Sequence, residues 1–229
     1  MKKHYNPAIE KPFLIDEEGS RLYNYEHTLQ FLQYRGRQRF GKSFTIQKED
    51  LPIIFKLLIY FTRSDNLCKE KGIDPNKGIL LAGPIGSGKT SLITLMTEFT
   101  LQSNHFFIRS TRAIAAEFHD DGYQVIQKYS WRPKIYCFDD LGVEQNMKYY
   151  GNECNTIAEI LLNRYDLMVK HGHVTHATTN LSASDLESLY GNRLRSRMRE
   201  MFNLIAFPNN TPINENDSNS SPLEGRSRG

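Results

Sequence analysis

The stretch that decides the fold is KGILLAGPIGSGKTSL, which runs from Lys77 to Leu92. Its first half is a short apolar run that predicts a buried strand, and its second half begins a helix. Between them, residues 83–90 match the pattern G-x-x-x-x-G-K-[ST], in which a glycine-rich turn points backbone N–H groups at phosphate oxygens. The helix that follows adds the positive end of its dipole. This stretch therefore predicts a P-loop nucleotide site.

The residue types of a P-loop have separate tasks. We expect Lys89 to reach the β- and γ-phosphates of a nucleotide and the Thr90 hydroxyl to bind Mg²⁺. ATP and Mg²⁺ are therefore the predicted cofactors. The predicted nucleotide-binding residues are the whole turn and the start of the helix: Gly83, Pro84, Ile85, Gly86, Ser87, Gly88, Lys89, Thr90 and Ser91.

A P-loop needs an acidic strand end to hold the metal, and KIYCFDD at 134–140 supplies one. We expect Asp139 to bind Mg²⁺ through its water shell, and Asp140 to polarise the attacking water. Many such ATPases carry Glu at the second position. Because Asp is one methylene shorter, either turnover is slow or Glu144 assists. The alternative interpretation is an Asp-Asp turn that simply follows a core strand.

A third strand end, in HVTHATTN at 173–180, carries Thr178, Thr179 and Asn180. A polar side chain beside the acidic strand is placed to position the hydrolytic water or to touch the γ-phosphate. Asn180 is therefore added to Lys89, Asp139 and Asp140 as a predicted catalytic residue. A Thr-Asn pair also ends many strands without any catalytic role.

Strand-like and helix-like segments alternate along most of the chain. This alternation predicts an α/β fold with a five-stranded parallel sheet between helices. The predicted strands are 77–83, 105–110, 134–140, 173–180 and 202–207, and the predicted helices are 51–63, 91–102, 111–118, 121–130, 155–170 and 182–200.

Composition shifts divide the chain into three parts. We predict an N-terminal arm over 1–45, an ATPase domain over 46–208 and a disordered tail over 209–229, since the tail is poor in apolar residues. The arm either contacts a partner or single-stranded nucleic acid, or packs its aromatic rings on the main domain. The residues behind these two hypotheses are the rings Phe31, Tyr34, Phe40 and Phe44 and the cations Arg35, Arg37, Arg39 and Lys42.

Composition also excludes several classes of protein. The three cysteines are widely spaced and form no CxxC pair, so neither a zinc ribbon nor a disulfide framework is indicated. No signal-peptide-like segment opens the sequence and no run is long enough to span a bilayer, so we expect a cytoplasmic protein with no membrane partner. His171, His173 and His176 cluster, but His173 and His176 would face opposite sides of a strand, which disfavours a metal site.

The late stretch YGNRLRSRMRE, at 190–200, carries arginine at every second position from Arg193 to Arg199. On a helix, Arg193 shares a face with Arg197, and Arg195 shares one with Arg199. The cluster either binds an anion or forms a solvated basic helix with local ion pairs.

These motifs, in this order, resemble those of AAA+ ATPases, and more closely the DnaC/IstB branch, which is related to the initiator DnaA. The resemblance covers about residues 45–208. In that family the second arginine of G-x-R-x-x-S-R reaches the ATP of a neighbouring subunit, and Arg197 holds this position. The stretches that carry the resemblance are KGILLAGPIGSGKTSL, FDDLGVE (138–144), ILLNRYD (160–166), TTNLS (178–182) and YGNRLRSRMRE.

The resemblance implies an ATP-hydrolysing switch protein, helicase-loader-like in DNA replication, that acts as an oligomer on single-stranded DNA. It implies slow ATPase activity stimulated by DNA or oligomerisation and a homo-oligomer formed through Arg197. The sequence departs from the initiator type in one respect, because only about twenty residues follow the strand predicted at 202–207, and we therefore expect no C-terminal lid domain. The family lines its DNA groove with an insert between the second and third strands. Candidate contacts in this insert, by location alone, are Arg109, Arg112, Lys128 and Arg132, and the alternative is that they are ordinary surface charges.

Three alternatives remain. The protein partner is a replicative helicase, a transposase or a phage protein, and a transposase would make the chain an IstB-like transposition helper. A P-loop small-molecule kinase is less favoured, because the arginines follow a Thr-Asn strand and the acidic strand ends in Asp-Asp. Asp140 also leaves open a nucleotide-gated module that does not hydrolyse ATP.

Overall fold

The computed structural model describes residues 11–15, 17–18, 21–100, 104–144, 147–149 and 152–208. The predicted disordered tail at 209–229 lies outside the described residues, and so do residues 1–10 of the predicted arm.

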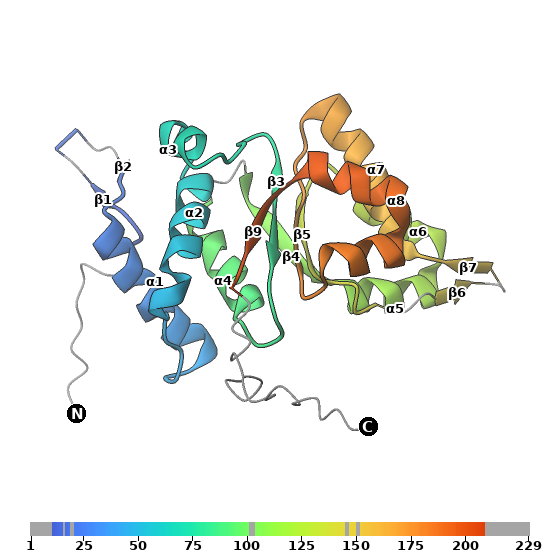
Figure 1. The fold of residues 1–229 in the computed structure, drawn as a ribbon, viewed down its shortest axis with the longest axis horizontal. Helices are drawn as coiled ribbons and strands as arrows, with labels where there is room; N and C mark the ends of the chain where they lie inside the picture. The colour runs from blue at the N-terminus through green and yellow to red at the C-terminus, as the bar shows by residue number, and fades with distance from the viewer. Residues whose placement is uncertain are drawn as a thin grey trace, which may run out of the picture.

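Five parallel strands form a central sheet in the order β4-β5-β8-β3-β9 (Figure 1). This confirms the predicted α/β fold with a five-stranded parallel sheet between helices. Because all the strands run the same way, their carboxyl ends meet at one edge of the sheet. The bounds are β3 (Gly78–Ala82), β4 (Phe106–Ser110), β5 (Ile135–Leu141), β8 (His176–Thr179) and β9 (Phe202–Ala206).

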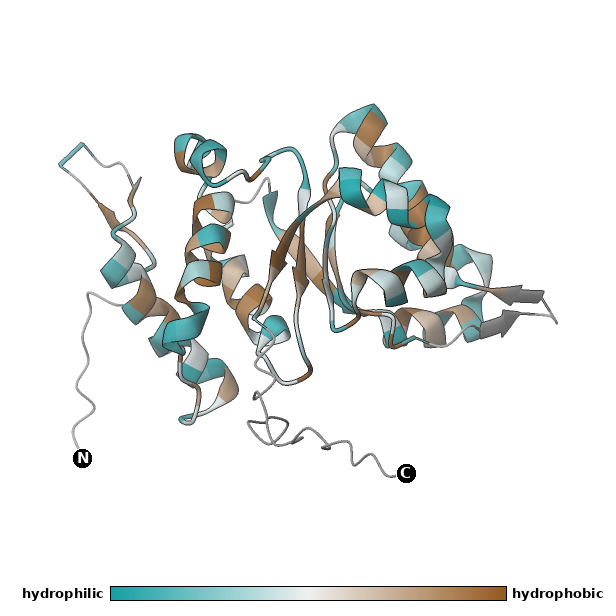
Figure 2. Ribbon diagram, in the orientation of Figure 1, coloured by the Kyte–Doolittle hydropathy of each residue, from teal (hydrophilic) through white to brown (hydrophobic). Residues whose placement is uncertain are grey.

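Helices cover both faces of the sheet. Alternate residues of β3 point to opposite faces of the sheet, and each face packs in its own apolar cluster. Ile79 and Leu81 belong to the first cluster and Leu80 belongs to the second. The first cluster contains α2 (Leu51–Phe61) and α4 (Lys89–Met96), and the second contains α5 (Thr111–Asp121), α6 (Tyr123–Ser130), α7 (Thr156–His171) and α8 (Ala183–Met201). In Figure 2 the strands between these layers are largely hydrophobic, as burial on both faces requires.

The predicted arm contains a helix, α1 (Tyr25–Phe40), that the sequence analysis did not identify. The Asn24 side chain caps it by accepting from the His27 N–H at 3.0 Å. Phe31 is buried and packs edge-on against Phe99, and Arg35 forms an ion pair with Glu98 at 2.6 Å. This part of the arm therefore packs on the main domain.

Shorter elements were also not predicted. They are α3 (Asp65–Glu70), two 3₁₀ turns at Lys48–Asp50 and Thr97–Phe99, and two antiparallel pairs. The pairs are β1 (Leu14–Ile15) with β2 (Arg21–Leu22), and β6 (Met147–Tyr149) with β7 (Asn152–Cys154). Their strands are only two or three residues long, too short for an alternating pattern to be recognised.

Candidate nucleotide-binding site

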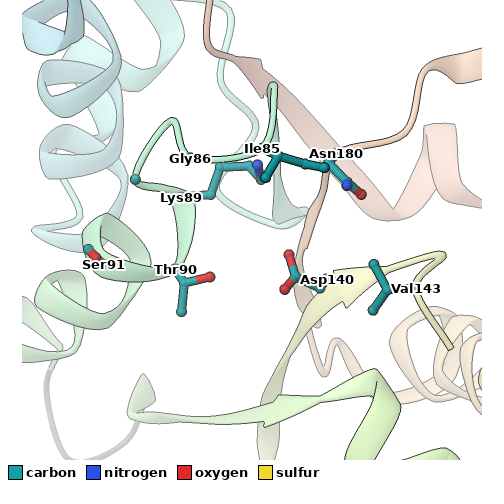
Figure 3. A pocket seen from close by; sticks show the side chains of 9 residues that line it. Ile85, Gly86, Lys89, Thr90, Ser91, Asp140, Val143 and Asn180 are labelled. Carbon is teal, nitrogen blue, oxygen red and sulfur yellow. The ribbon is translucent and has the colours of Figure 1, made fainter.

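A cavity of about 450 Å³ lies where the P-loop meets the carboxyl ends of β5 and β8 (Figure 3). Its volume is within the range typical of small-molecule sites. The residues that line it are Ile85, Gly86, Gly88, Lys89, Thr90, Ser91, Asp140, Val143 and Asn180. Segments far apart in the sequence, all from the predicted motifs, thus meet around one cavity.

The P-loop has the open, glycine-dependent backbone that its sequence predicts. Gly86 and Gly88 have φ angles of 81° and 85°, which side-chain-bearing residues seldom adopt. Gly88 is also the residue from which α4 begins. The helix therefore starts at the cavity, with the unpaired N–H groups of its first turn available to an anion.

Lys89 lies within the loop, and its side chain is buried. Its Nζ donates to the carbonyl oxygens of Gly83 and Pro84, both at 2.8 Å. Burial lowers the pKa of Lys89, while Asp140 and Asp139 act in the opposite direction. An ammonium group has three donors, so one remains for a phosphate oxygen.

Asp139 is the buried acidic residue of the site. The Thr90 Oγ1 lies 3.0 Å from both of its carboxylate oxygens, and the Thr178 Oγ1 donates to Oδ1 at 2.7 Å. Burial raises the pKa of Asp139, and the hydrogen bonds from Thr178 and Thr90 counteract part of that rise. A hydroxyl beside a carboxylate is an oxygen-donor set that suits Mg²⁺, which keeps several of its own waters.

Asp140 has an unusual backbone, with a φ angle of 62° at an irregularity in the pairing of β5 with β8. Two threonines hold this conformation. The Asp140 N–H donates to the Thr178 Oγ1 at 2.9 Å, and the Thr111 Oγ1 donates to the Asp140 carbonyl at 2.7 Å. The carboxylate is turned toward the P-loop (Figure 3), so the local strain places a second acidic group in the cavity.

The end of β8 contributes residues with different surroundings. Asn180 lines the cavity, and its buried Oδ1 has no hydrogen-bond partner among the described residues. Thr179 instead donates to the Leu141 carbonyl at 2.9 Å. Thr178, which the sequence analysis named without a specific role, bonds to both acidic residues of β5. The only sequence feature that hints at this role is its place at the strand end.

Glu144, the suggested assistant to Asp140, is held away from the cavity. Its Oε2 accepts from the Gly142 N–H at 2.8 Å, and its Oε1 accepts from the Tyr190 hydroxyl. Its side chain is buried and does not line the cavity. These contacts give Glu144 a structural role in the loop after β5.

The four late arginines lie on α8, whose helical geometry is interrupted at Gly191. Arg197 lies over the Tyr165 ring of α7 at 4.4 Å, with a long contact of 3.5 Å to Asp166. Arg195 lines a neighbouring groove of about 600 Å³ that Asn180 also borders, and its buried Nε has no partner among the described residues. None of the four arginines lines the nucleotide cavity of its own chain.

No cluster of metal ligands is found in the described part of the chain. No group of three or more His, Cys, Asp or Glu side chains there is arranged so that it could hold a metal ion. His176 is buried and its Nδ1 accepts from the Ile79 N–H at 3.1 Å. None of the described helices combines the length and the apolar character that crossing a membrane requires.

A P-loop after β3, with acidic and polar residues at the ends of β5 and β8, defines an α/β P-loop protein of the AAA+ fold class. Comparisons with protein-family models and with curated proteins found no match.

Solved structures resemble the chain over most of its length. A protein described as a primosome component, from Streptococcus pyogenes serotype M3, has 17% identity and a TM-score of 0.51, with 71% of this chain and 81% of that chain covered. DnaI has 16% identity and a TM-score of 0.51, with coverages of 72% and 88%. The DnaC helicase loader has 17% identity and a TM-score of 0.51, with coverages of 73% and 95%. The chain therefore has a DnaC-type AAA+ fold.

Proposed function

We propose that this protein binds and hydrolyses ATP as a helicase-loader-like switch that acts as an oligomer on single-stranded DNA. The observation that carries the proposal is the hydrogen-bonded chain Thr90–Asp139–Thr178, which joins the P-loop helix to the ends of β5 and β8. A hydroxyl and a carboxylate joined in this way, beside a lysine and a second carboxylate, match the metal-binding groups of a P-loop ATPase and support the proposal.

The residues of the cavity have matching roles in this proposal. The P-loop N–H groups and Lys89 bind the phosphates, and Thr90 and Asp139 hold Mg²⁺, whose charge stabilises the β- and γ-phosphate oxygens. Asp140 orients and polarises the attacking water, and Asn180 positions that water or contacts the γ-phosphate. The strained backbone of Asp140 and the unpartnered Oδ1 of Asn180 support these two assignments.

Arg197 supplies the arginine finger to a neighbouring subunit. Its distance from its own chain's cavity supports action in trans, because it does not line that cavity. The 3.5 Å contact to Asp166 is long for an ion pair, so its loss costs little, and the Tyr165 ring at 4.4 Å is the other contact that the side chain gives up when it reaches a phosphate oxygen. Turnover is therefore slow in the monomer and rises on oligomerisation.

The protein partner in this proposal is a replicative helicase, and the resemblance to the structure named a DnaC helicase loader supports it. An IstB-like transposition helper is the alternative, and binding to a transposase in place of a helicase would identify it. A small-molecule kinase is less favoured, since the late arginines lie outside the nucleotide cavity instead of over it.

The proposal is tested by the anisotropy of a labelled single-stranded oligonucleotide, titrated with protein plus ATP, ADP or neither at a stated salt concentration. Steady-state ATP hydrolysis is measured on the same samples, with Lys89→Ala as the control for nucleotide dependence. Tight binding with ATP alone, together with DNA-stimulated hydrolysis, supports the proposal. Equal or absent binding in all three states argues for a kinase or a switch that acts only on proteins.

A further inference from the structure

The loop between α6 and β5 exposes an aromatic and basic sequence, Trp131-Arg132-Pro133-Lys134, here named the WRPK loop. All four residues are exposed, and the Trp131 side chain is 50% accessible. Trp131 is also the single tryptophan of the protein. An exposed indole beside two cations is the combination that binds unpaired bases, since the ring stacks on a base and the cations hold phosphates.

A second exposed ring extends this surface. Phe107 lies on β4, at the edge of the sheet, and is 39% accessible. The Lys134 Nζ lies 5.1 Å from the centre of the Phe107 ring, so the loop and the edge strand meet. The loop precedes the amino end of β5, whereas Asp139 and Asp140 are at its carboxyl end, so this surface and the nucleotide cavity lie at opposite edges of the sheet.

A buried arginine holds the backbone of the WRPK loop in place through a hydrogen bond. Arg164 of α7 is fully buried, and its Nη1 donates to the Arg132 carbonyl at 3.1 Å. Its Nε donates to the Thr175 Oγ1 at 2.9 Å, and its Nη2 donates to the Val174 carbonyl at 3.1 Å. Burial lowers the pKa of Arg164 to about 10, so the guanidinium stays charged at neutral pH.

The cations of the WRPK loop differ from Lys128 of α6, which forms an ion pair with Glu117 at 2.7 Å. Arg132, Lys134 and Arg164 form no ion pair within the described part of the chain. The WRPK loop thus combines cations that form no ion pair with exposed rings, and its backbone is held by Arg164.

We propose that the WRPK loop and Phe107 form a stacking platform for single-stranded DNA. The inference rests on the proposed function in that it takes DNA as the partner, and it adds a contact site and its chemistry. Trp131 stacks on an unpaired base, Arg132 and Lys134 bind the flanking phosphates, and Arg164 acts as a positioning residue that holds the loop. A base inside a duplex hides its face, so the platform selects single strands.

The test uses Trp131 as its own reporter in the full-length protein. Intrinsic fluorescence is followed while a thymidine oligonucleotide is added, and a matched oligonucleotide with abasic sites keeps the phosphates but removes the bases. We expect quenching by the thymidine strand and much weaker quenching by the abasic strand or a duplex. In anisotropy titrations, Trp131→Ala is expected to weaken thymidine-strand binding about tenfold and to leave abasic-strand binding unchanged.

Two further variants test the phosphate contact and the specificity of the Trp131 effect. The slope of log affinity against log salt concentration measures the number of phosphate contacts. Lys134→Ala is expected to reduce the magnitude of this slope by about 0.7, as loss of one phosphate contact on a single strand predicts. Tyr123→Ala is the matched control, since Tyr123 is 54% accessible and lies at the other end of α6, and it is expected to bind like the wild type.

The outcomes separate this inference from the proposed function. The wild type could bind the thymidine strand without a change in Trp131 fluorescence, and Trp131→Ala could bind that strand as tightly as the wild type. This result would reject the stacking platform but leave the proposal of DNA binding intact. An equal loss for thymidine and abasic strands with Trp131→Ala also overturns base stacking. If the wild type binds no strand in any nucleotide state, both are wrong, and the exposed tryptophan then marks a protein contact.

Discussion

The Thr178 hydroxyl donates to the Asp139 carboxylate at 2.7 Å and accepts from the Asp140 N–H at 2.9 Å. One buried hydroxyl of β8 therefore orients both acidic residues of β5. The side chain of Asp139 and the backbone of Asp140 depend on a residue that lies on another strand.

Thr178→Val tests this relationship, because valine keeps the shape of threonine and removes its hydroxyl. We expect turnover to fall about 10- to 100-fold, as is usual when a partner of a metal ligand is lost. The free energy of unfolding should also fall by about 1–3 kcal/mol, since the Asp140 N–H loses its acceptor. ATP hydrolysis against Mg²⁺ concentration and urea unfolding measure the two effects. Thr178→Ser is the control and should behave like the wild type, whereas wild-type turnover in Thr178→Val would contradict the role.

Asp140 and Glu144 are the two candidates for the carboxylate that polarises water, and we expect their variants to differ in turnover. Asp140→Asn should lower turnover at least about 100-fold with ATP affinity retained, because a general base typically contributes 10²–10⁴. Glu144→Gln should retain turnover within about twofold, since the amide oxygen can still accept from the Gly142 N–H while the amide NH2 group donates to the Tyr190 hydroxyl oxygen. Single-turnover hydrolysis measures both. The reverse ranking would make Glu144 the functional carboxylate.

The arginine finger is tested by mixing two inactive proteins. Arg197→Ala should bind ATP normally and lose stimulated turnover about 10³-fold or more, because its finger acts on a neighbour. Lys89→Ala should lose nucleotide binding but keep its finger. We therefore expect a mixture of the two to recover part of the activity that neither has alone. Arg193→Ala, an exposed arginine on the same helix, is the control. Normal stimulated turnover in Arg197→Ala alone would remove the assignment.

His176 makes the stability of the fold depend on pH. Burial lowers its pKa from 6.5 to about 3 in the folded protein. Between these values the unfolded chain takes up a proton that the folded chain does not, so stability falls as the pH falls. We expect this residue to contribute a slope of up to about 1.4 kcal/mol per pH unit below pH 6.5. Urea unfolding from pH 7.5 to pH 5 measures it.

His176→Asn is the matched variant for this measurement, because its side-chain oxygen can still accept from the Ile79 N–H. It should show a shallower dependence on pH than the wild type. Asp139, whose raised pKa acts in the opposite direction, is present in both proteins and cancels from the comparison. Equal slopes in the two proteins would show that His176 is not the group responsible.

The sequence by itself determined the strands of the sheet and predicted the candidate nucleotide site, because both depend on local patterns. Apolar runs bounded by turn residues identified the five strands of the sheet, and the glycine turn at 83–90 predicted a phosphate site. The missed helix α1 has many polar residues on its surface, and its buried Phe31 and Leu32 are identified only by the elements they pack against.

Only the tertiary structure decided which side chains act together. Thr178 is 39 residues from Asp139, Tyr190 is 46 from Glu144, and Arg164 is 32 from the Arg132 carbonyl that it holds. A repeating pattern reports which face of an element is buried, but a hydrogen bond depends on the positions of two atoms set by different elements. Thr178 as a link between two carboxylates, Glu144 as a structural residue and the WRPK loop as a fixed surface could therefore be recognised only once the chain was folded.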